Sequence, residues 1–435
     1  MPALVFPLSR IEGHARVVIH IEGGEVRSAS FQAMEFRGFK QLVRGVPAEQ
    51  MTVIVPRICG VCSTAHHIAA VKALEDAYGV EPPPLARRLR ELLLLGQLIQ
   101  SHATSLFIFT MPDRLGVSSI FDAGQEKEMN EQAQIARRAL AVRTAGTHII
   151  TVAGGQFIHP VKAVVGGMTD GVEPDAAAAL SEELATQLPH ACELFELYIR
   201  KSLELSERLG TWGDDAPAWY LAAVRDAQPN FDGDALRLLG PDGKLTTFPA
   251  GAHHEYLTYE QPDYSYSGRT SCGGEPLRAN SLARINLAQS MGTPLADQYL
   301  HRFRKAFGQP AHAILLFDLA RGIELVYAIE RARQILAMPL NAEDADTPYT
   351  PRDGHGYGLV EAPRGPLIHH YVIENGLIAD AEFVIPTVHN IKSIERALMV
   401  AARRYISGDK IDMELERAVG RVVRAFDPCI ACATH

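Results

Sequence analysis

Residues 57–66 read RICGVCSTAH, and residues 427–435 read DPCIACATH. Each stretch holds two cysteines separated by two residues, Cys59 with Cys62 and Cys429 with Cys432. A CxxC turn lets both sulfurs converge on one metal, so the two pairs can supply four thiolate ligands. Zinc, an iron–sulfur cluster or another thiophilic metal would accept such a set, and the pattern leaves this choice open. A shared site would bring the two distant stretches of the chain together.

A structural zinc site and a redox dithiol are the alternative interpretations of these pairs. Zinc sites of four cysteines usually close short loops, whereas this one would close nearly the whole chain. A redox dithiol normally needs one CxxC near a βαβ pattern, not two at opposite ends. Cys192 and Cys272 have no motif partner, and we expect both to be ordinary thiols. An interaction protein with a structural zinc site nevertheless stays open as one alternative function.

Composition narrows the class of protein. The 435 residues include 42 Lys and Arg against 51 Asp and Glu, a net charge of −9. An acidic chain is a poor candidate for binding nucleic acid through phosphates. Six cysteines are too few for a disulfide-stapled chain of this length. The opening residues, MPALVFPLSR, lack the basic segment and cleavage site of a secretory signal, so we expect a cytoplasmic protein.

The longest uncharged stretch runs from Leu92 to Pro112 and is long enough to cross a membrane. Its polar residues argue instead for a helix buried in a large soluble protein, so we expect no membrane span. Several of them follow helical spacing and form one polar stripe: Gln97, Gln100, Ser101 and Thr104. A buried stripe of this kind either bonds neighbouring backbone or walls a polar site.

The remaining patterns predict a mainly α fold with small mixed β elements (α+β). A β-hairpin is expected within 1–35, and a strand pair turning at Asn375-Gly376. The helical patterns cover 64–78, a long helix opened by EPPPLARR (81–88), 125–150, 174–210, 294–307, 315–337, 391–406 and 411–425. Residues 340–370 look like a Gly/Pro-rich loop, and 211–280 like a turn- and strand-rich insertion. We expect a single domain over 1–435.

Five segments together resemble the large subunit of nickel–iron hydrogenases. They are RIEGH (10–14), EFRGF (35–39), the first cysteine pair with His66, APRGP (362–366) and DPCIACATH (427–435). The order and spacing of the two cysteine motifs agree with that family, and the resemblance covers the whole chain. The triplet QSH at 100–102 is similar to cytoplasmic, multisubunit members. The resemblance implies long central helices, with the metal site between the N- and C-terminal segments.

The resemblance also implies an activity, the reversible cleavage of H2 to protons and electrons at a nickel–iron centre. Its iron would carry carbon monoxide and two cyanides. Cys59 and Cys429 would be terminal ligands of nickel, Cys62 and Cys432 would bridge nickel and iron, and Cys429 would accept the proton. The chain has no further iron–sulfur motif, so electrons would leave through an iron–sulfur small subunit, with further electron-transfer subunits beyond it. A hydrogen-sensing regulatory hydrogenase is the alternative within this family.

Other residues take roles by the same resemblance. Glu12 would relay the proton, or else cap or pair locally. His66 would donate to a bridging sulfur, or else pack in the core. Arg364 would lie over the open metal position near one cyanide, and Thr387, after Pro386, would donate to the other. Asp427 would pair with Arg364 or its neighbours, or else cap the last turn.

Lys40 departs from the family pattern. Members usually have a glutamate 19 residues before the first cysteine, where this chain has Lys40. That glutamate binds magnesium together with a C-terminal histidine and a backbone carbonyl, here His435 and Phe383. Either Glu35 or another carboxylate serves in its place, or the Lys40 ammonium replaces the cation. We favour the ammonium and expect no magnesium bound by His435. A chain that stops at this histidine looks like the processed form of the family.

Overall fold

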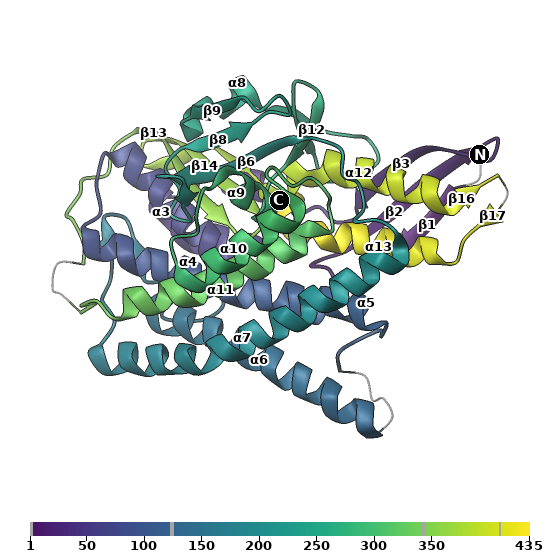
Figure 1. The fold of residues 1–435 in the computed structure, drawn as a ribbon. Coiled ribbons are helices and arrows are strands. Elements are labelled where there is room, and N and C mark those ends of the chain that lie inside the picture. Colours follow the sequence, from purple (N-terminus) through teal and green to yellow (C-terminus); the bar gives the residue numbers. More distant parts are fainter. Residues whose placement is uncertain (1–2, 122–125, 342–344, 409) are drawn as a thin grey trace.

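Long helices form the centre of the molecule. The computed structural model describes residues 3–121, 126–341, 345–408 and 410–435. α4 (Pro84–Ala103), α6 (Glu126–Gly154), α7 (Pro174–Leu209) and α11 (Leu316–Leu336) pack on one another (Figure 1). Gly96 and Gly146 let α4 and α6 touch, because a Cβ at Gly146 would lie 2.6 Å from the backbone nitrogen of Gln100.

α4 continues through a π-helical turn, η3 (Thr104–Thr110), into α5 (Met111–Leu115). Within the described residues this run, 84–115, is the one helix long and apolar enough to cross a membrane. Of its most apolar window, 83% is buried inside the protein. The run is therefore placed as a core helix, as its polar residues indicated.

Most of the predicted helices are present. α3 (Ser63–Tyr78), α7, α10 (Pro294–Phe307) and α11 lie within two residues of their predicted bounds. α6 covers the predicted helix but ends later, at Gly154 instead of residue 150, and residue 125 lies outside the described part. α12 (Pro386–Tyr405) begins earlier than predicted, because Pro386 can occupy a first turn. α13 (Glu414–Phe426) begins later than predicted, after a short strand pair, β16 (Ile406–Ser407) with β17 (Lys410–Ile411).

A three-stranded sheet lies at one end of the molecule, on the right in Figure 1. It consists of β1 (Ala3–Pro7), β2 (Ala15–Glu22) and β3 (Glu25–Ala33), in the order β1-β2-β3. β2 and β3 form the predicted hairpin, turning at Gly23-Gly24. α12 packs on β3.

The segment 211–280 holds its own sheet. Its strands are β6 (Trp219–Arg225), β7 (Gln228–Pro229), β8 (Leu236–Leu239), β9 (Leu245–Phe248), β10 (Thr258–Glu260), β11 (Arg269–Cys272) and β12 (Glu275–Arg278). The order is β10-β11-β12-β6-β8-β9, with β7 beside β6. Its apolar residues pack on Leu359 and Ile368, outside the segment. Because the main core also runs from Ala15 to Ala433, we propose that residues 1–435 form a single domain.

The prediction of a loop over 340–370 was wrong for its second half. β13 (Gly354–Ala362) pairs with β14 (Gly365–Glu374) along its whole length, and only Pro363 and Arg364 form the turn. The glycines that suggested a loop serve close packing instead. A Cβ at Gly356 or Gly358 would collide with the backbone of α3. Residues 342–344 of that prediction lie outside the described part.

β14 continues into β15 (Leu377–Val384) through the predicted Asn375-Gly376 turn, where both residues have positive φ, the conformation of a two-residue hairpin. The short elements complete the list: α1 (Phe39–Leu42), η1 (Ala48–Gln50), α2 (Met51–Ile54), η2 (Val55–Ile58), β4 (Ala163–Val164), β5 (Gly167–Met168), η4 (Ala250–Ala252), α8 (His253–Tyr256), α9 (Ser281–Leu287) and α14 (Ile430–Ala433). The predicted α+β class is confirmed.

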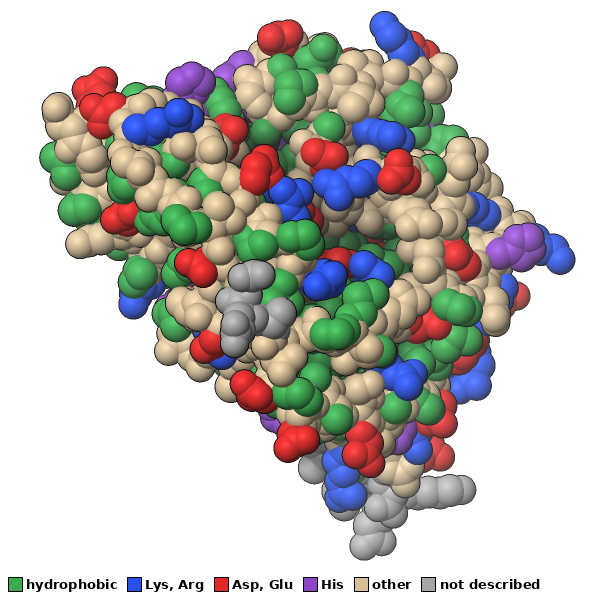
Figure 2. Space-filling view, turned by 90° about the vertical axis from the view of Figure 1, so that its left-hand side faces the viewer, with side chains coloured by type: hydrophobic (Ala, Val, Ile, Leu, Met, Phe, Trp, Pro, Cys, Tyr) green, Lys and Arg blue, Asp and Glu red, His purple; other side chains and the backbone are tan. Residues whose placement is uncertain are grey.

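One face of the molecule is shown in Figure 2, the side that lies on the left in Figure 1. Basic and acidic side chains are interspersed over it, and some of both kinds border a hollow near the middle. On the described part of this face no extended area of a single charge is visible. Mixed charge of this kind produces no strong field of one sign over the face.

Candidate metal centre

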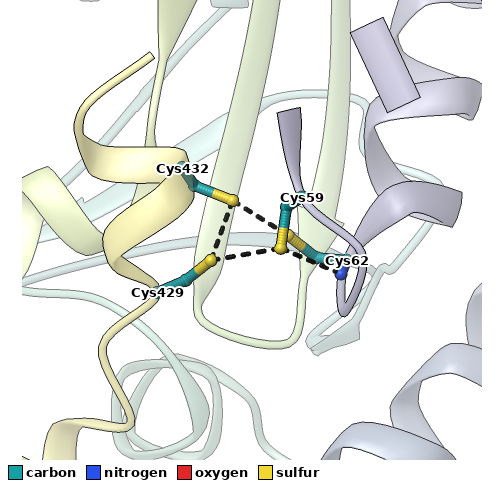
Figure 3. Close-up of side chains that lie close together, drawn as sticks. All are labelled: Cys59, Cys62, Cys429 and Cys432. Atoms are coloured by element: carbon teal, nitrogen blue, oxygen red, sulfur yellow. Dashed lines mark hydrogen bonds between the residues drawn. The ribbon is translucent and has the colours of Figure 1, made fainter. Parts of the chain in front are cut away.

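The four motif cysteines converge at one buried point (Figure 3). The Sγ atoms of Cys59 and Cys429 lie 3.3 Å apart, those of Cys62 and Cys432 3.0 Å, and those of Cys429 and Cys432 3.0 Å. All four sulfurs lie within 4.8 Å of one another. These separations exceed a disulfide bond, and all four are free thiols. The structure therefore builds the four-sulfur ligand set that the sequence indicated.

The first pair is shaped by the turn between η2 and α3. The backbone of Cys59 is extended. The backbone N–H groups of Val61 and Cys62 donate to its Sγ at 3.3 and 3.4 Å. Cys62 stands at the N-cap of α3, a helix of 16 residues. These amide donors favour the thiolate form of Cys59, and the thiolate is the form that binds metals.

The second pair is held against the N-terminal segment. Asp427 ends α13 with a φ of 50°, and the chain then runs beside Glu12, which forms a parallel bridge with Cys429. The N–H of Ile430 donates to the carbonyl of Glu12 at 3.2 Å. The N–H of Ala431 donates to the Glu12 carboxylate at 3.0 Å. Residues far apart in the sequence thus build one wall of the site.

The thiols titrate as a group. Hydrogen bonding from Cys429 lowers the pKa of Cys59 well below its usual range. Burial raises the pKa of Cys429 and of Cys432 well above theirs. A cluster of four thiolates in a buried place needs a positive ion to balance its charge, which a divalent metal supplies.

Glu12 lies beside this cluster with an altered acidity. Burial and the charge of Cys59 raise the pKa of its carboxyl group. The carboxyl group accepts from Ala431 in the first turn of α14, so it caps that helix while it lies next to Cys429. A raised pKa makes the Glu12 carboxylate a stronger proton acceptor than an ordinary glutamate.

Arg364, at the tip of the β13–β14 hairpin, is fully enclosed. Its Nε donates to the carbonyl of Asp427 at 2.7 Å, and its Nη2 lies 3.2 Å from the Asp427 carboxylate. Burial disfavours its charge, but Asp427 and the cysteines outweigh burial and raise the pKa of Arg364. Its Nη1 is buried and has no hydrogen-bond partner among the described residues. The predicted pairing with Asp427 is present, and one donor is left over.

Thr387 contacts the backbone of Cys429. Its Oγ1 accepts a hydrogen bond from the N–H of Cys429 at 3.0 Å, at the start of α12, which opens with Pro386. The hydroxyl proton is not used in that bond, so it can be donated to an acceptor beside the sulfurs.

His66 leads a chain of polar contacts away from the site. Its Nε2 lies 3.5 Å from Cys432 Sγ, and its Nδ1 lies 3.0 Å from Nε2 of His369. Nδ1 of His369 lies 2.7 Å from the hydroxyl of Tyr371. Burial lowers the pKa of His66 to about 4 and that of His369 well below its usual value, so both rings are neutral at pH 7. His369 and Tyr371 were not predicted, because they lie on β14 without ligand spacing.

Lys40, Phe383 and His435 line one cavity of about 270 Å³. The Phe383 ring meets the His435 ring edge-on at 5.3 Å, and Nδ1 of His435 lies 2.9 Å from the carbonyl oxygen of Cys432. The Lys40 ammonium lies 4.0 Å from Asp380. Glu35 is not among the lining residues, and its carboxylate lies 2.5 Å from His14 instead.

A buried ionic network supports the Arg364 hairpin, and sequence reasoning missed it. Arg284 on α9 pairs with Glu324 at 2.5 Å and with Glu361 at 2.7 Å, and all three side chains are fully buried. Arg284 also donates to the carbonyls of Ala362 and Pro363 at 3.1 and 2.9 Å. These are the two residues before Arg364, so the network fixes the direction in which the hairpin tip points.

The polar stripe of α4 is only partly satisfied by protein atoms. Gln97 accepts from the N–H of Ala65 on α3 at 3.0 Å, and Thr104 donates to the carbonyl of Gln100 at 2.7 Å. The Ser101 hydroxyl is buried with no partner among the described residues. The stripe therefore reaches the helix that carries Cys62, and its place in the site wall stays a prediction.

Comparisons with known proteins agree with this geometry. The family model of nickel-dependent hydrogenases matches residues 37–139 and 236–435, and a HoxL-like model matches residues 5–36. One component of the F420-non-reducing hydrogenase vhu of Methanococcus voltae is 34% identical over 92% of this chain and 97% of its own length. The beta component of the NAD-reducing hydrogenase HoxS of Cupriavidus necator is 29% identical over 99% of this chain and 94% of its own. The crystal structure of an NAD+-reducing [NiFe]-hydrogenase in the H2-reduced state superposes with a TM-score of 0.90 at 28% identity, with both chains fully covered.

Proposed function

The chain belongs to the nickel-dependent hydrogenase family as its catalytic component, and from this premise we propose how its residues carry out the reaction. The observation that carries the proposal is the convergence of four free, buried cysteine sulfurs within 4.8 Å. Thiolates are soft, strongly donating ligands and suit nickel and iron. Cys59 and Cys429 would hold nickel, and Cys62 and Cys432 would hold both nickel and iron.

In this proposal the iron would carry carbon monoxide and two cyanides. Support comes from two unused donors beside Cys429, the buried Nη1 of Arg364 and the hydroxyl proton of Thr387. Cyanide is an anionic acceptor, so a guanidinium and a hydroxyl are suitable donors to two such ligands. When bound, the nickel–iron centre supplies the splitting of H2 into protons and electrons.

The protein provides the route for the proton. The Cys429 sulfur accepts it first, because a terminal thiolate keeps lone pairs free to act as a base. Glu12, which lies beside Cys429 and has a raised pKa, takes it next. His66 stays neutral and orients the shared Cys432 sulfur, because its other nitrogen is held by His369.

Lys40 takes the place of the magnesium ion found elsewhere in the family. Its ammonium lines the same cavity as His435 and Phe383, and its charge contributes to lowering the pKa of His435, after burial. An ammonium cannot ligate a cation, so we expect no magnesium at His435. Magnesium bound to His435 in an experimental density map would contradict this assignment.

Electrons leave through an iron–sulfur small subunit. Support comes from exposed apolar residues in the segment 36–42, whose Arg37 reaches the first cysteine turn. Phe36 and Leu42 are 64% and 63% exposed, and Arg37 between them donates to the carbonyl of Ile58, next to Cys59. Such residues mark an interaction surface when they gather at one place. A partner docked here would lie close to the metal site.

The cellular location of the complex is inferred from one of the relatives. A relative is named for the reduction of NAD, which is a soluble carrier, so we infer a cytoplasmic complex with further electron-transfer subunits. This chain acts on H2.

Metal analysis combined with turnover tests the proposal. Cys429→Ser should lose nickel and more than about 10³-fold of the H2-dependent dye reduction. Cys192→Ser, a change at a cysteine outside the cluster, should keep both. Equal activity in the two variants would overturn the assignment of Cys429.

A further inference from the structure

A second group of metal-type side chains lies in the part of the chain that the structure describes. It comprises His253 and His254 at the start of α8 and Glu382 on β15. We propose that these three residues bind a divalent metal ion of the zinc type, at a site separate from the four cysteines. The site lies on the cavity that Lys40 and His435 also line.

The ligand atoms are already gathered. One atom from each of the three side chains lies within 4.8 Å of the others. Nε2 of His254 lies 3.2 Å from Oε2 of Glu382, and Nε2 of His253 lies 3.7 Å from Oε1. Each carboxylate oxygen thus faces a different imidazole, and one ion can be reached by both rings.

The tautomer of His253 indicates a ligand. Its Nδ1 lies 2.8 Å from the carbonyl of Ala250, and a carbonyl only accepts, so Nδ1 carries the proton. In the neutral ring, Nε2 then presents a lone pair toward the Glu382 carboxylate. That nitrogen is buried without a hydrogen-bond partner, in a side chain only 3% exposed. A lone pair that faces a carboxylate favours a positive charge between them, which either a metal ion or a second ring proton can supply.

The surroundings of this site resemble those of known metal sites. Metal-binding histidines usually donate their other N–H to a carbonyl or carboxylate, as His253 does to Ala250. His254 is 63% exposed, which gives an ion a path from solvent. Nδ1 of His370 lies 3.9 Å from Glu382, and its Nε2 also lacks a partner among the described residues.

The positive charge of Lys40 opposes a cation in this cavity, but Asp380 lies 4.0 Å from the ammonium and offsets part of its charge. The donors select the class of ion. Two imidazoles and one carboxylate are typical of zinc with an open fourth position. Magnesium prefers oxygen ligands and octahedral geometry, so these donors disfavour it.

A bound ion would connect two parts of the fold. In the sequence α8 follows β9 and precedes β10, so it belongs to the 211–280 segment. Glu382 lies on β15 and precedes Phe383, whose ring contacts His435. The ion would link the 211–280 segment to β15, the strand that carries Phe383 against His435. Its effect would be structural, on the stability of this wall.

Zinc titration of the nickel-loaded enzyme complex tests this inference, because the four cysteines are then occupied. After removal of loosely bound metal with a chelator, the wild type should bind one Zn²⁺ at this site. His254→Ala should weaken this binding at least about tenfold, and Glu382→Gln likewise. The matched control is His148→Ala, an exposed histidine that also lies beside a carboxylate, that of Glu183 at 2.9 Å.

X-ray absorption at the zinc edge identifies the ligands. We expect nitrogen and oxygen at about 2.0–2.2 Å and no sulfur shell at about 2.3 Å. Equal zinc binding by His254→Ala and the wild type, a sulfur shell, or no zinc binding would each overturn the proposal. Nickel content and H2 turnover are read separately, so a failed zinc site leaves the hydrogenase assignment untouched.

Discussion

We propose two tasks for the single side chain of Glu12. It accepts the N–H of Ala431 and so caps α14, and it lies next to Cys429 with a raised pKa. The sequence suggested a proton relay and a capping residue as alternatives, whereas the structure supports both for the same carboxyl group. The cap holds the carboxyl group beside the sulfur that it is proposed to serve.

Glu12→Gln separates the two tasks. The amide oxygen can still accept from Ala431, but the side chain can no longer carry a proton. We expect H2 oxidation with an artificial dye to fall about 10²-fold or more, while nickel content stays unchanged. Glu12→Asp keeps the carboxyl group and should retain an intermediate rate. A Gln variant as fast as the wild type would remove Glu12 from the proton route.

At this scale the sequence located the residues that belong to motifs and missed those that do not. The four cysteines, Glu12 and Arg364 were identifiable because short motifs surround them. His369 and Arg284 were not, because each reaches the site through one other residue and has no motif of its own. Only folding brings His369 and Arg284 close to the metal site.

The β13–β14 hairpin is the element whose prediction failed. In the sequence Gly356 and Gly358 suggest a loop, whereas in the structure they permit close contact with the backbone of α3. A single sequence cannot distinguish a glycine needed for a turn from one needed for packing. The Asn375-Gly376 turn was predictable, because both residues there adopt positive φ as a two-residue hairpin requires.

Arg284→Lys tests the support of this hairpin. Lysine keeps the positive charge but cannot make all the bonds to Glu324, Glu361 and the carbonyls before Arg364. We expect a loss of about 1–3 kcal/mol in the free energy of unfolding, together with a lower turnover number at unchanged nickel content. Thermal unfolding and steady-state rates would show this. Arg302→Lys, in an exposed pair with Glu196, should change neither, and an identical result for both arginines would contradict the positioning role.

The whole molecule closes on its metal site from distant parts of the sequence. The helices α4, α6, α7 and α11 form the body, while residues 10–14, 57–66 and 427–435 meet in the site. This arrangement was predictable from the spacing of the two cysteine pairs and from the family resemblance. The surface through which a partner binds was not, because exposure is a property of the folded chain.

The exposed side chains of Phe36 and Leu42 predict where the iron–sulfur partner docks. Phe36→Asp combined with Leu42→Asp should weaken assembly of the complex by about 30-fold or more, because buried apolar contacts would be replaced by unpaired charges. Size-exclusion chromatography or analytical ultracentrifugation of the co-expressed subunits measures it. Met413→Asp is the control, since Met413 is 95% exposed and follows β17, whose turn contacts Gly24 at the other end of β3. Equal assembly of the two variants would place the interface elsewhere.

Buried histidines make the fold sensitive to acid. Burial lowers the pKa of His67 to about 4, below its usual 6.5. The unfolded chain therefore takes up this proton first as pH falls, so the stability that this site contributes is present above pH 6.5 and is lost between pH 6.5 and 4. The full loss is on the order of 3 kcal/mol.

His67→Gln should therefore flatten the dependence of the unfolding temperature on pH over this window. Thermal unfolding at a series of pH values would show it, with His148→Gln as an exposed control. Parallel pH profiles for wild type and His67→Gln would show that His67 does not titrate in this way.

The central claim is that Cys59, Cys62, Cys429 and Cys432 hold a nickel–iron centre whose iron carries carbon monoxide and two cyanides. Infrared spectroscopy of the protein, purified from a host able to assemble the centre, tests it most directly. We predict one carbonyl stretch and two cyanide stretches, which disappear together with nickel in Cys429→Ser. Protein that contains nickel and iron but shows no such bands would contradict the account, and four cysteines filled by zinc alone would point to a structural site.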